Sequence, residues 1–151
     1  MVTGGEAMRV RDLIGVRKQV YSITEETTVD AAARYLRERQ VRSVGVLNSA
    51  GKLVGVLSQS DISNKVSAEN KCPAWMRVSE IMTRELVTVT PEVPLDECLR
   101  LMEHHGIFHL LVVDEAENFR GLLSVTDLLR VIASDQKARA DMLEAFAFPP
   151  R

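Results

Sequence analysis

The sequence contains one seven-residue motif twice in the same frame. GVLSQSD begins at Gly55 and GLLSVTD begins at Gly121, 66 positions later. The same shift places residues 24–61 on residues 90–127 without a gap. Identical pairs are Thr24/Thr90, Glu26/Glu92, Asp30/Asp96, Arg34/Arg100, Val46/Val112, Gly55/Gly121, Leu57/Leu123, Ser58/Ser124 and Asp61/Asp127. Self-similarity at a fixed period indicates a structural repeat, so the chain is expected to fold as two similar units.

Each copy predicts the order strand, helix, strand, strand, helix. Apolar residues recur at helical spacing from Val29 and again from Leu95, and β-rich runs joined by turn residues follow each of these segments. Strands are expected at 20–23, 41–47 and 53–57, and again at 86–89, 107–113 and 119–123. Helices are expected at 29–36 and 60–66, and again at 95–102 and 126–133. A unit of about fifty residues buries little surface alone, so we expect the two copies to share one core.

The repeat also predicts the domain organisation. Upstream of the gapless match, VRDLI at residue 10 aligns with VSEIM at residue 78, so the first copy carries two additional residues before its first strand. We expect repeat 1 at 8–66, a linker at 67–77, repeat 2 at 78–133 and a C-terminal helical tail at 134–151. The tail contains apolar and aromatic residues, and either folding back on the module or contact with a partner would cover them.

Composition excludes several classes of protein. The net charge is −2, from 19 basic and 21 acidic residues, so the chain lacks the basic surface that binds nucleic acid or an anionic membrane. No apolar run approaches the roughly 18–20 residues of a membrane helix. The two cysteines, Cys72 and Cys98, do not predict a disulfide framework, and we expect a cytoplasmic protein in which Cys98 packs in the core.

The sequence does not predict an enzyme. His104, His105 and His109 could suggest a metal site, but Gly106 is expected to end the helix and separate His109 from the other two. The sequence contains no Walker loop, no G-x-S-x-G motif and no Cys–His pairing that would form a nucleophilic site. We therefore expect no metal, no catalytic residue and no catalytic cofactor.

The repeated Ser-x-x-Asp allows two interpretations. Ser58 with Asp61, and Ser124 with Asp127, have the spacing of a capping box, which would only start two helices. Gly55 and Gly121 favour a second role, because a glycine in a strand lets another group approach the backbone. A helix N-terminus attracts phosphate, and an ionised aspartate accepts hydrogen bonds from paired ribose hydroxyls. The same residues therefore also predict two nucleotide sites.

These motifs together resemble two cystathionine-β-synthase (CBS) motifs in tandem, the arrangement called a Bateman module. The resemblance covers residues 8–133 and rests on VRDLIG, YSIT, VRSVGVLN and GVLSQSDI in the first copy, and on VSEIMTRELVTVT, HHGIFHLLVVD and GLLSVTDLL in the second. It implies an α+β fold in which two pseudo-symmetric β-α-β-β-α repeats pack into one module through their sheets. Gly45 and Leu111 stand where the family usually has proline.

The resemblance also implies ligand contacts. Asp61 and Asp127 would bind ribose. Phosphate contacts would come from Ser58, Ser60, Ser124, Thr126, Arg42, Ser43 and His109. The adenine pockets would be formed by Ile14, Val20 and Val41 in one site, and by Met82, Leu86, Ile107 and Phe108 in the other. Arg42 can bind phosphate with two hydrogen bonds, whereas histidine is only partly charged near neutral pH. We therefore expect the two sites to differ in affinity.

The function implied is a stand-alone regulatory module that senses AMP, ADP or ATP, with S-adenosylmethionine or NAD as alternative ligands. A homodimer is expected, and its output would pass through an unknown regulated protein or through rearrangement of the dimer. A ligand-free interaction module is the first rival interpretation. Nucleic-acid binding is the second, and the acidic charge and few aromatic residues disfavour it.

Overall fold

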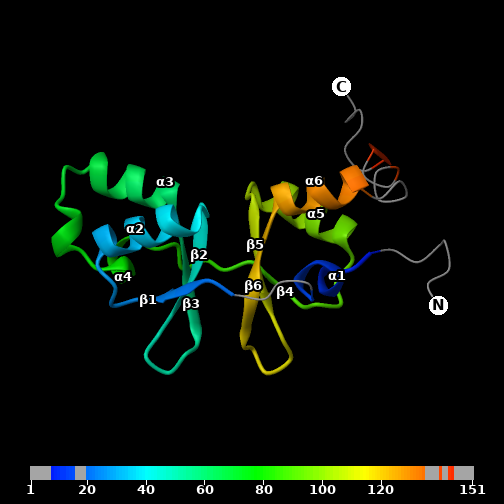
Figure 1. Cartoon of the computed structure of the whole chain (residues 1–151), viewed down its shortest axis with the longest axis horizontal. Coiled ribbons are helices and arrows are strands. Elements are labelled where there is room, and N and C mark those ends of the chain that lie inside the picture. The colour runs from blue at the N-terminus through cyan, green and yellow to red at the C-terminus, as the bar shows by residue number, and fades with distance from the viewer. Residues whose placement is uncertain (1–7, 16–19, 135–139, 141–142, 145–151) are drawn as a thin grey trace.

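The structure is a computed structural model that describes residues 8–15, 20–134, 140 and 143–144. Its two halves lie side by side, each with a three-stranded sheet and several helices, as Figure 1 shows. The first half of the chain forms α1 (Val10–Ile14), β1 (Ser22–Thr24), α2 (Val29–Arg39), β2 (Ser43–Leu47), β3 (Leu53–Ser58), α3 (Gln59–Ile62), the π-helix η1 (Ser63–Ser67) and the 3-10 helix η2 (Pro73–Trp75). The second half forms α4 (Val78–Ile81), β4 (Thr88–Val89), α5 (Leu95–His105), β5 (His109–Val113), β6 (Phe119–Ser124) and α6 (Val125–Ser134). The expected α+β fold with two similar repeats is confirmed.

The two sheets repeat each other residue by residue. The order is β1-β2-β3 in one and β4-β5-β6 in the other, with a parallel first pair and an antiparallel second pair. The 66-residue shift also relates their registers, since Val44 lies opposite Leu57 and Leu110 opposite Leu123. The first strand of each repeat begins two residues later than expected, at Ser22 and Thr88.

Both long helices end in a left-handed residue. Gln40 closes α2 with φ 56°, and Gly106 closes α5 with φ 64°. Gly106 therefore separates the adjacent His104 and His105 from His109, as predicted. Glycine adopts this conformation without a steric penalty, which explains why it follows α5.

The short helices α1 and α4 are exchanged between the repeats. The Val78 N–H at the start of α4 donates to the Thr27 carbonyl at 2.8 Å, just before α2. The Val10 N–H at the start of α1 donates to the Val93 carbonyl at 2.9 Å, just before α5. Figure 1 shows α4 beside α2 and α1 in the half that contains α5. Each repeat is thus completed by the helix that begins the other repeat in sequence.

The buried apolar side chains form two clusters, so the expectation of one shared core is wrong. The first contains Ile23, Val29, Ala32, Leu36, Val44, Val46, Leu57 and Val66 of repeat 1, with Met76, Val78, Ile81 and Met82 of the second half. The second contains Val89, Leu95, Cys98, Leu99, Met102, Leu110, Val112, Leu123 and Leu128 of repeat 2, with Val10 and Ile14 of α1. The exchanged helices supply the apolar surface that a small repeat lacks alone. Cys98 is buried as expected, and burial raises the pKa of its thiol to about 12.

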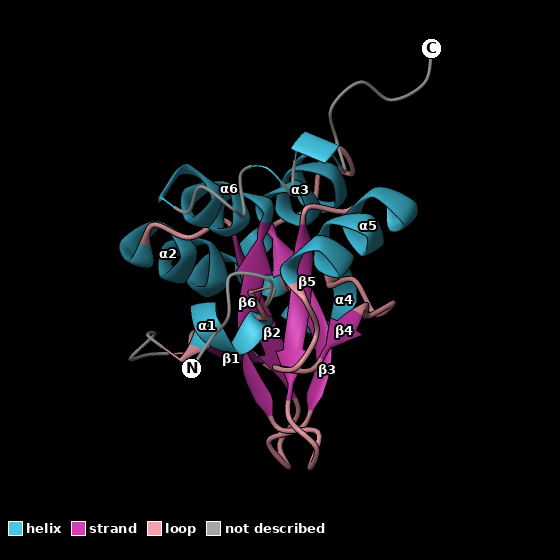
Figure 2. Cartoon of the chain, turned by 90° about the vertical axis from the view of Figure 1, so that its right-hand side faces the viewer, coloured by secondary structure: helices cyan, strands magenta, loops and turns pink. Residues whose placement is uncertain are grey.

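The sheets contact each other on the faces turned away from these clusters. A Cβ built on Gly45 of β2 would lie 2.6 Å from the Phe119 ring of β6, so the glycine makes room for that ring. Leu111 of β5, which replaces the family's proline in the other repeat, is buried outside both clusters. In Figures 1 and 2 the helices α2, α3, α5 and α6 gather at one end of the strands, and the hairpin turns lie at the opposite end. The strand ends that lead into α3 and α6 therefore lie at the helical end of the molecule.

Candidate ligand-binding site

Two equivalent sets of polar residues meet where a hairpin leads into a helix. We call Arg42, Ser43, Ser58, Ser60 and Asp61 the first cradle. We call Phe108, His109, Ser124, Thr126 and Asp127 the second cradle. The pairing of β2 with β3 places Ser43 opposite Ser58, and that of β5 with β6 places His109 opposite Ser124. The Gln59 N–H donates to the Arg42 carbonyl and the Val125 N–H to the Phe108 carbonyl, both at 3.0 Å.

A capping box forms in both cradles. In the first, the Ser58 N–H donates to Asp61 Oδ2 at 3.0 Å and the Asp61 N–H donates to Ser58 Oγ at 3.2 Å. In the second, the Ser124 N–H donates to Asp127 Oδ2 at 2.9 Å and the Asp127 N–H donates to Ser124 Oγ at 3.1 Å. Each aspartate is therefore held at the first turn of its helix, at the end of the hairpin.

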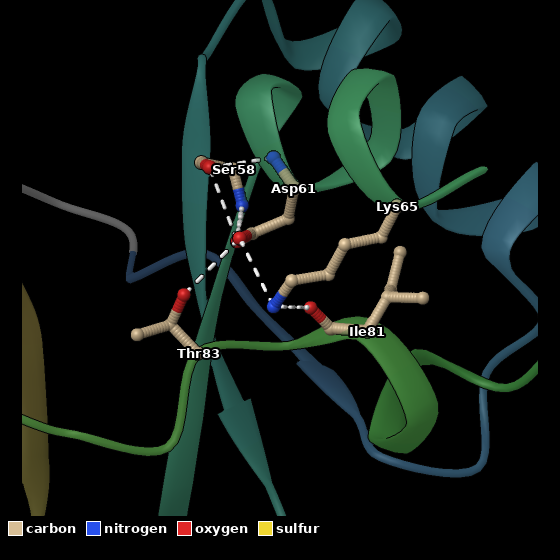
Figure 3. Close-up of polar contacts among 5 residues, drawn as sticks. All are labelled: Ser58, Asp61, Lys65, Ile81 and Thr83. Atoms are coloured by element: carbon tan, nitrogen blue, oxygen red, sulfur yellow. Dashed lines mark hydrogen bonds and ion pairs between the residues drawn. The ribbon is translucent and has the colours of Figure 1, made fainter. Parts of the chain in front are cut away.

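Asp61 has further partners that the sequence did not predict (Figure 3). Ser58 Oγ donates to Oδ2 at 3.1 Å, and Thr83 Oγ1 donates to Oδ1 at 3.1 Å. Lys65 Nζ lies 3.8 Å from Oδ1 and donates to the Ile81 carbonyl at 2.9 Å. Lys65 follows Asp61 by one helical turn, a spacing visible in the sequence, whereas Thr83 comes from the segment after α4. The exchange of α4 is what brings Thr83 to this carboxylate.

The repeated glycines have structural explanations. A Cβ on Gly55 would lie 2.6 Å from Met82 Sδ and 3.1 Å from the Thr83 carbonyl, so the group that approaches this strand is the protein's own chain. Gly121 has φ 143°, which other residues rarely adopt. The glycines therefore do not support a ligand, contrary to the sequence interpretation.

The first cradle contains an unsatisfied polar atom. Within the described part of the chain, Ser43 Oγ and Asp30 Oδ1 are the buried side-chain oxygens without a hydrogen-bond partner. Ser43 lies directly opposite Ser58, and opposite residues of an antiparallel pair project from the same face of a sheet. Because buried polar groups nearly always have partners, this hydroxyl points to a missing one at the cradle.

The apolar residues assigned to adenine pack with both clusters. Met82 lies in the first cluster and Val41 packs against it, whereas Ile14 lies in the second cluster and Ile107 packs against it. The sequence grouped Ile14 with Val41 in one ligand site and Met82 with Ile107 in the other, and this assignment stays a prediction. Met82 and Ile14 are buried, Leu86 is partly buried, and Val20 and Phe108 are 44% and 69% exposed.

His109 is a half-buried titratable group of the second cradle. Burial holds the pKa of His109 below its usual 6.5, the nearby Asp127 carboxylate raises it, and Arg42 of the first cradle lowers it. The neutral imidazole is therefore favoured in the folded chain. Arg42, a phosphate candidate of the first cradle, thus also disfavours the charged form of His109, a phosphate candidate of the second.

The stability of the protein should depend on pH through His109. Because its folded pKa is lowered, the unfolded chain binds more protons in the window just below pH 6.5, so the free energy of unfolding should rise with pH there and level off above it. His109→Gln should flatten that rise in urea unfolding measured from about pH 5 to 8. His104→Gln is the matched control, because it changes an exposed histidine of α5. An equally steep rise in His109→Gln would contradict the assignment.

The described residues contain no group of three or more His, Cys, Asp or Glu side chains placed to hold a metal ion. Among the helices they form, none has the length and apolarity needed to cross a bilayer.

Comparison with known proteins identifies the repeat. The CBS domain family matches residues 10–68 and again 78–134. A homoserine O-acetyltransferase of Methanococcoides burtonii is 34% identical over 115 residues, which cover 76% of this chain but 22% of that enzyme. The chain thus spans about a fifth of that relative.

Solved structures give the same result over most of the chain. A protein with CBS domains from Burkholderia ambifaria superposes with a TM-score of 0.79 at 27% identity, covering 85% of this chain and 96% of that one. The CBS domain pair of protein MJ0100, solved in complex with 5′-methylthioadenosine and S-adenosyl-L-methionine, superposes with a TM-score of 0.76 at 26% identity, covering 85% and 98%. The chain belongs to the CBS domain family and carries two copies of its domain.

Proposed function

We propose that this chain is a regulatory CBS-pair module that binds an adenosine nucleotide, AMP, ADP or ATP, in its two cradles. The observation that carries the proposal is the buried Ser43 hydroxyl, which lacks a partner within the described protein and lies opposite Ser58 at the start of a helix. A ligand oxygen at that position would satisfy it. The structural relative bound to two adenosine derivatives supports an adenosine compound as the ligand class.

The chemistry of the cradles fits the parts of a nucleotide. Asp61 and Asp127 are carboxylates suited to the paired hydroxyls of a ribose. The hydroxyls of Ser43, Ser58, Ser60, Ser124 and Thr126, with Arg42 and His109, would face the phosphate or whichever group replaces it. The apolar surface for a purine ring would come from Val20, Val41, Met82 and Leu86, with Ile14, Ile107 and Phe108.

Thermal unfolding tests the proposal. A ligand at 100 times its Kd stabilises a protein by about 2.7 kcal/mol, which for a chain of this size raises Tm by roughly 5–10 °C. AMP, ADP and ATP should each be compared with S-adenosylmethionine, 5′-methylthioadenosine and NAD, with GMP as the control for the base. A shift with adenosine compounds and a smaller one with GMP is expected. If no adenosine compound moves the transition, the module is a ligand-free interaction scaffold.

The remaining parts of the proposal concern the output of the module. The chain would act as an energy or metabolite sensor, through a homodimer or a regulated partner protein, in the cytoplasm. Ligand binding can produce such an output only if two states of the module bind the ligand unequally. Light scattering at micromolar concentration measures whether the dimer forms.

A further inference from the structure

Three of the about four acceptor positions of the Asp61 carboxylate are already occupied by hydrogen bonds, and a lysine faces the carboxylate as well. Each oxygen of a carboxylate offers about two lone pairs to donors. Oδ2 accepts from the Ser58 N–H at 3.0 Å and from Ser58 Oγ at 3.1 Å. Oδ1 accepts from Thr83 Oγ1 at 3.1 Å and faces Lys65 Nζ at 3.8 Å. A ribose that donates two hydroxyls to this carboxylate must therefore displace at least one of these donors.

Lys65 and Thr83 are both anchored by a second contact. Lys65 Nζ donates to the Ile81 carbonyl at 2.9 Å, which also satisfies a carbonyl at the end of α4. Thr83 exchanges two backbone hydrogen bonds with Val56 of β3, at 2.9 and 3.0 Å. The Asp61 side chain is only 12% exposed between them, while that of Lys65 is 43% exposed (Figure 3). The contacts on Asp61 are therefore part of the fold.

The second repeat does not encode the same pair of contacts. The residue 66 positions after Lys65 is Val131, and the residue 68 positions before Thr83 is Gly15. Neither side chain carries a donor, so neither can reproduce the interaction of Lys65 or Thr83 with the aspartate. The residues aligned with Lys65 and Thr83 therefore cannot form this pair of side-chain contacts with Asp127.

We infer that Lys65 and Thr83 form a latch on the ribose-binding carboxylate of the first cradle, which a ligand with paired hydroxyls must open before it binds there. Opening the latch releases the contact of Asp61 in α3 with Thr83, which lies in the part of the chain after α4, and the contact of Asp61 with Lys65, which is itself bonded to the Ile81 carbonyl. Occupancy of the first cradle is thereby coupled to the junction between the repeats. This inference rests on the proposed function and adds an affinity-setting device to it.

Calorimetry with AMP on variants that lack Asp127 isolates the first cradle. In an Asp127→Ala background, Lys65→Met keeps the aliphatic stem but removes the charge, and AMP should bind about two to five times more tightly, the range of a half-exposed ion pair. Thr83→Val removes the hydroxyl from a side chain of similar shape, and binding should tighten by about two- to tenfold. Lys52→Met is the matched control, because it removes one positive charge at an exposed turn position.

Different results separate the latch from the function on which it rests. Tighter binding in both latch variants, with the control unchanged, supports the latch, and so does binding that appears only in those variants. Weaker or unchanged binding in Lys65→Met and Thr83→Val overturns it, since these side chains would then assist the ligand or not affect it. If the unsubstituted protein and every variant fail to bind any adenosine compound, the proposed function fails and the latch with it.

Discussion

Replacing Asp61 and Asp127 together with alanine should abolish the thermal stabilisation by adenosine nucleotide. Each substitution leaves two ribose hydroxyls unpaired in a partly desolvated cradle, at about 1–3 kcal/mol for each group. Each single substitution should remove one binding event in calorimetry and largely spare the other. The affinity lost at each site is then expected to exceed about tenfold.

The same substitutions also remove two helix caps, and this effect must be measured separately. Loss of a capping carboxylate costs about 0.5–2 kcal/mol of stability, so the unliganded variants should melt at lower temperature. Asp96→Ala is a suitable control, because Asp96 pairs with Arg100 on α5 at 3.2 Å and belongs to neither cradle. Unchanged ligand affinity in the double variant, together with a lowered Tm, would mean that the repeated motif serves only to start two helices.

Truncating Ile81 should destabilise the repeat to which it does not belong by sequence. Ile81 is 1% exposed and lies in the cluster of repeat 1. Ile81→Ala should therefore cost about 2–5 kcal/mol in urea unfolding, the range for large-to-alanine changes in a core. Hydrogen exchange should show the largest loss of protection in β2 and β3.

Two comparison variants make this result specific. Ile14→Ala on α1 should lower protection in β5 and β6, because Ile14 lies in the other cluster. Leu129→Ala removes a comparable side chain that is 52% exposed, and it should have a small effect. Loss of protection in β5 and β6 after Ile81→Ala would contradict the exchanged arrangement.

The sequence predicted the features that depend on local order. The 66-residue shift predicted that both repeats have the same strand register and the same capping box, because each of these features is determined by residues close together in the chain. The end of α5 at Gly106 was predicted for the same reason. The π-helix η1 after α3 was not predicted, since its residues also fit a continuous α-helix.

The sequence could not predict the features that depend on which repeat an element packs against. The apolar residues of α1 and α4 indicate that these helices are covered, but the two repeats offer nearly the same surface. This ambiguity explains why the sequence did not predict that Met82 packs in the cluster of repeat 1 and Ile14 in the cluster of repeat 2. For the same reason the contact of Thr83 with Asp61 was not predicted, since it spans 22 residues and depends on the position of α4.

The exchange of α1 and α4 also determines the order in which the repeats can fold while the chain is being synthesised. Arg9, beside α1, donates through Nη1 to the carbonyl of Glu92, a residue 83 positions later. Synthesis adds about 5–20 residues per second, so the segment that covers α1 is made roughly 4–17 seconds after α1 itself. Val10 and Ile14 have no native partner during that interval. On the ribosome, repeat 1 can close once α4 has emerged, whereas α1 is made before α4 but can be buried only after it.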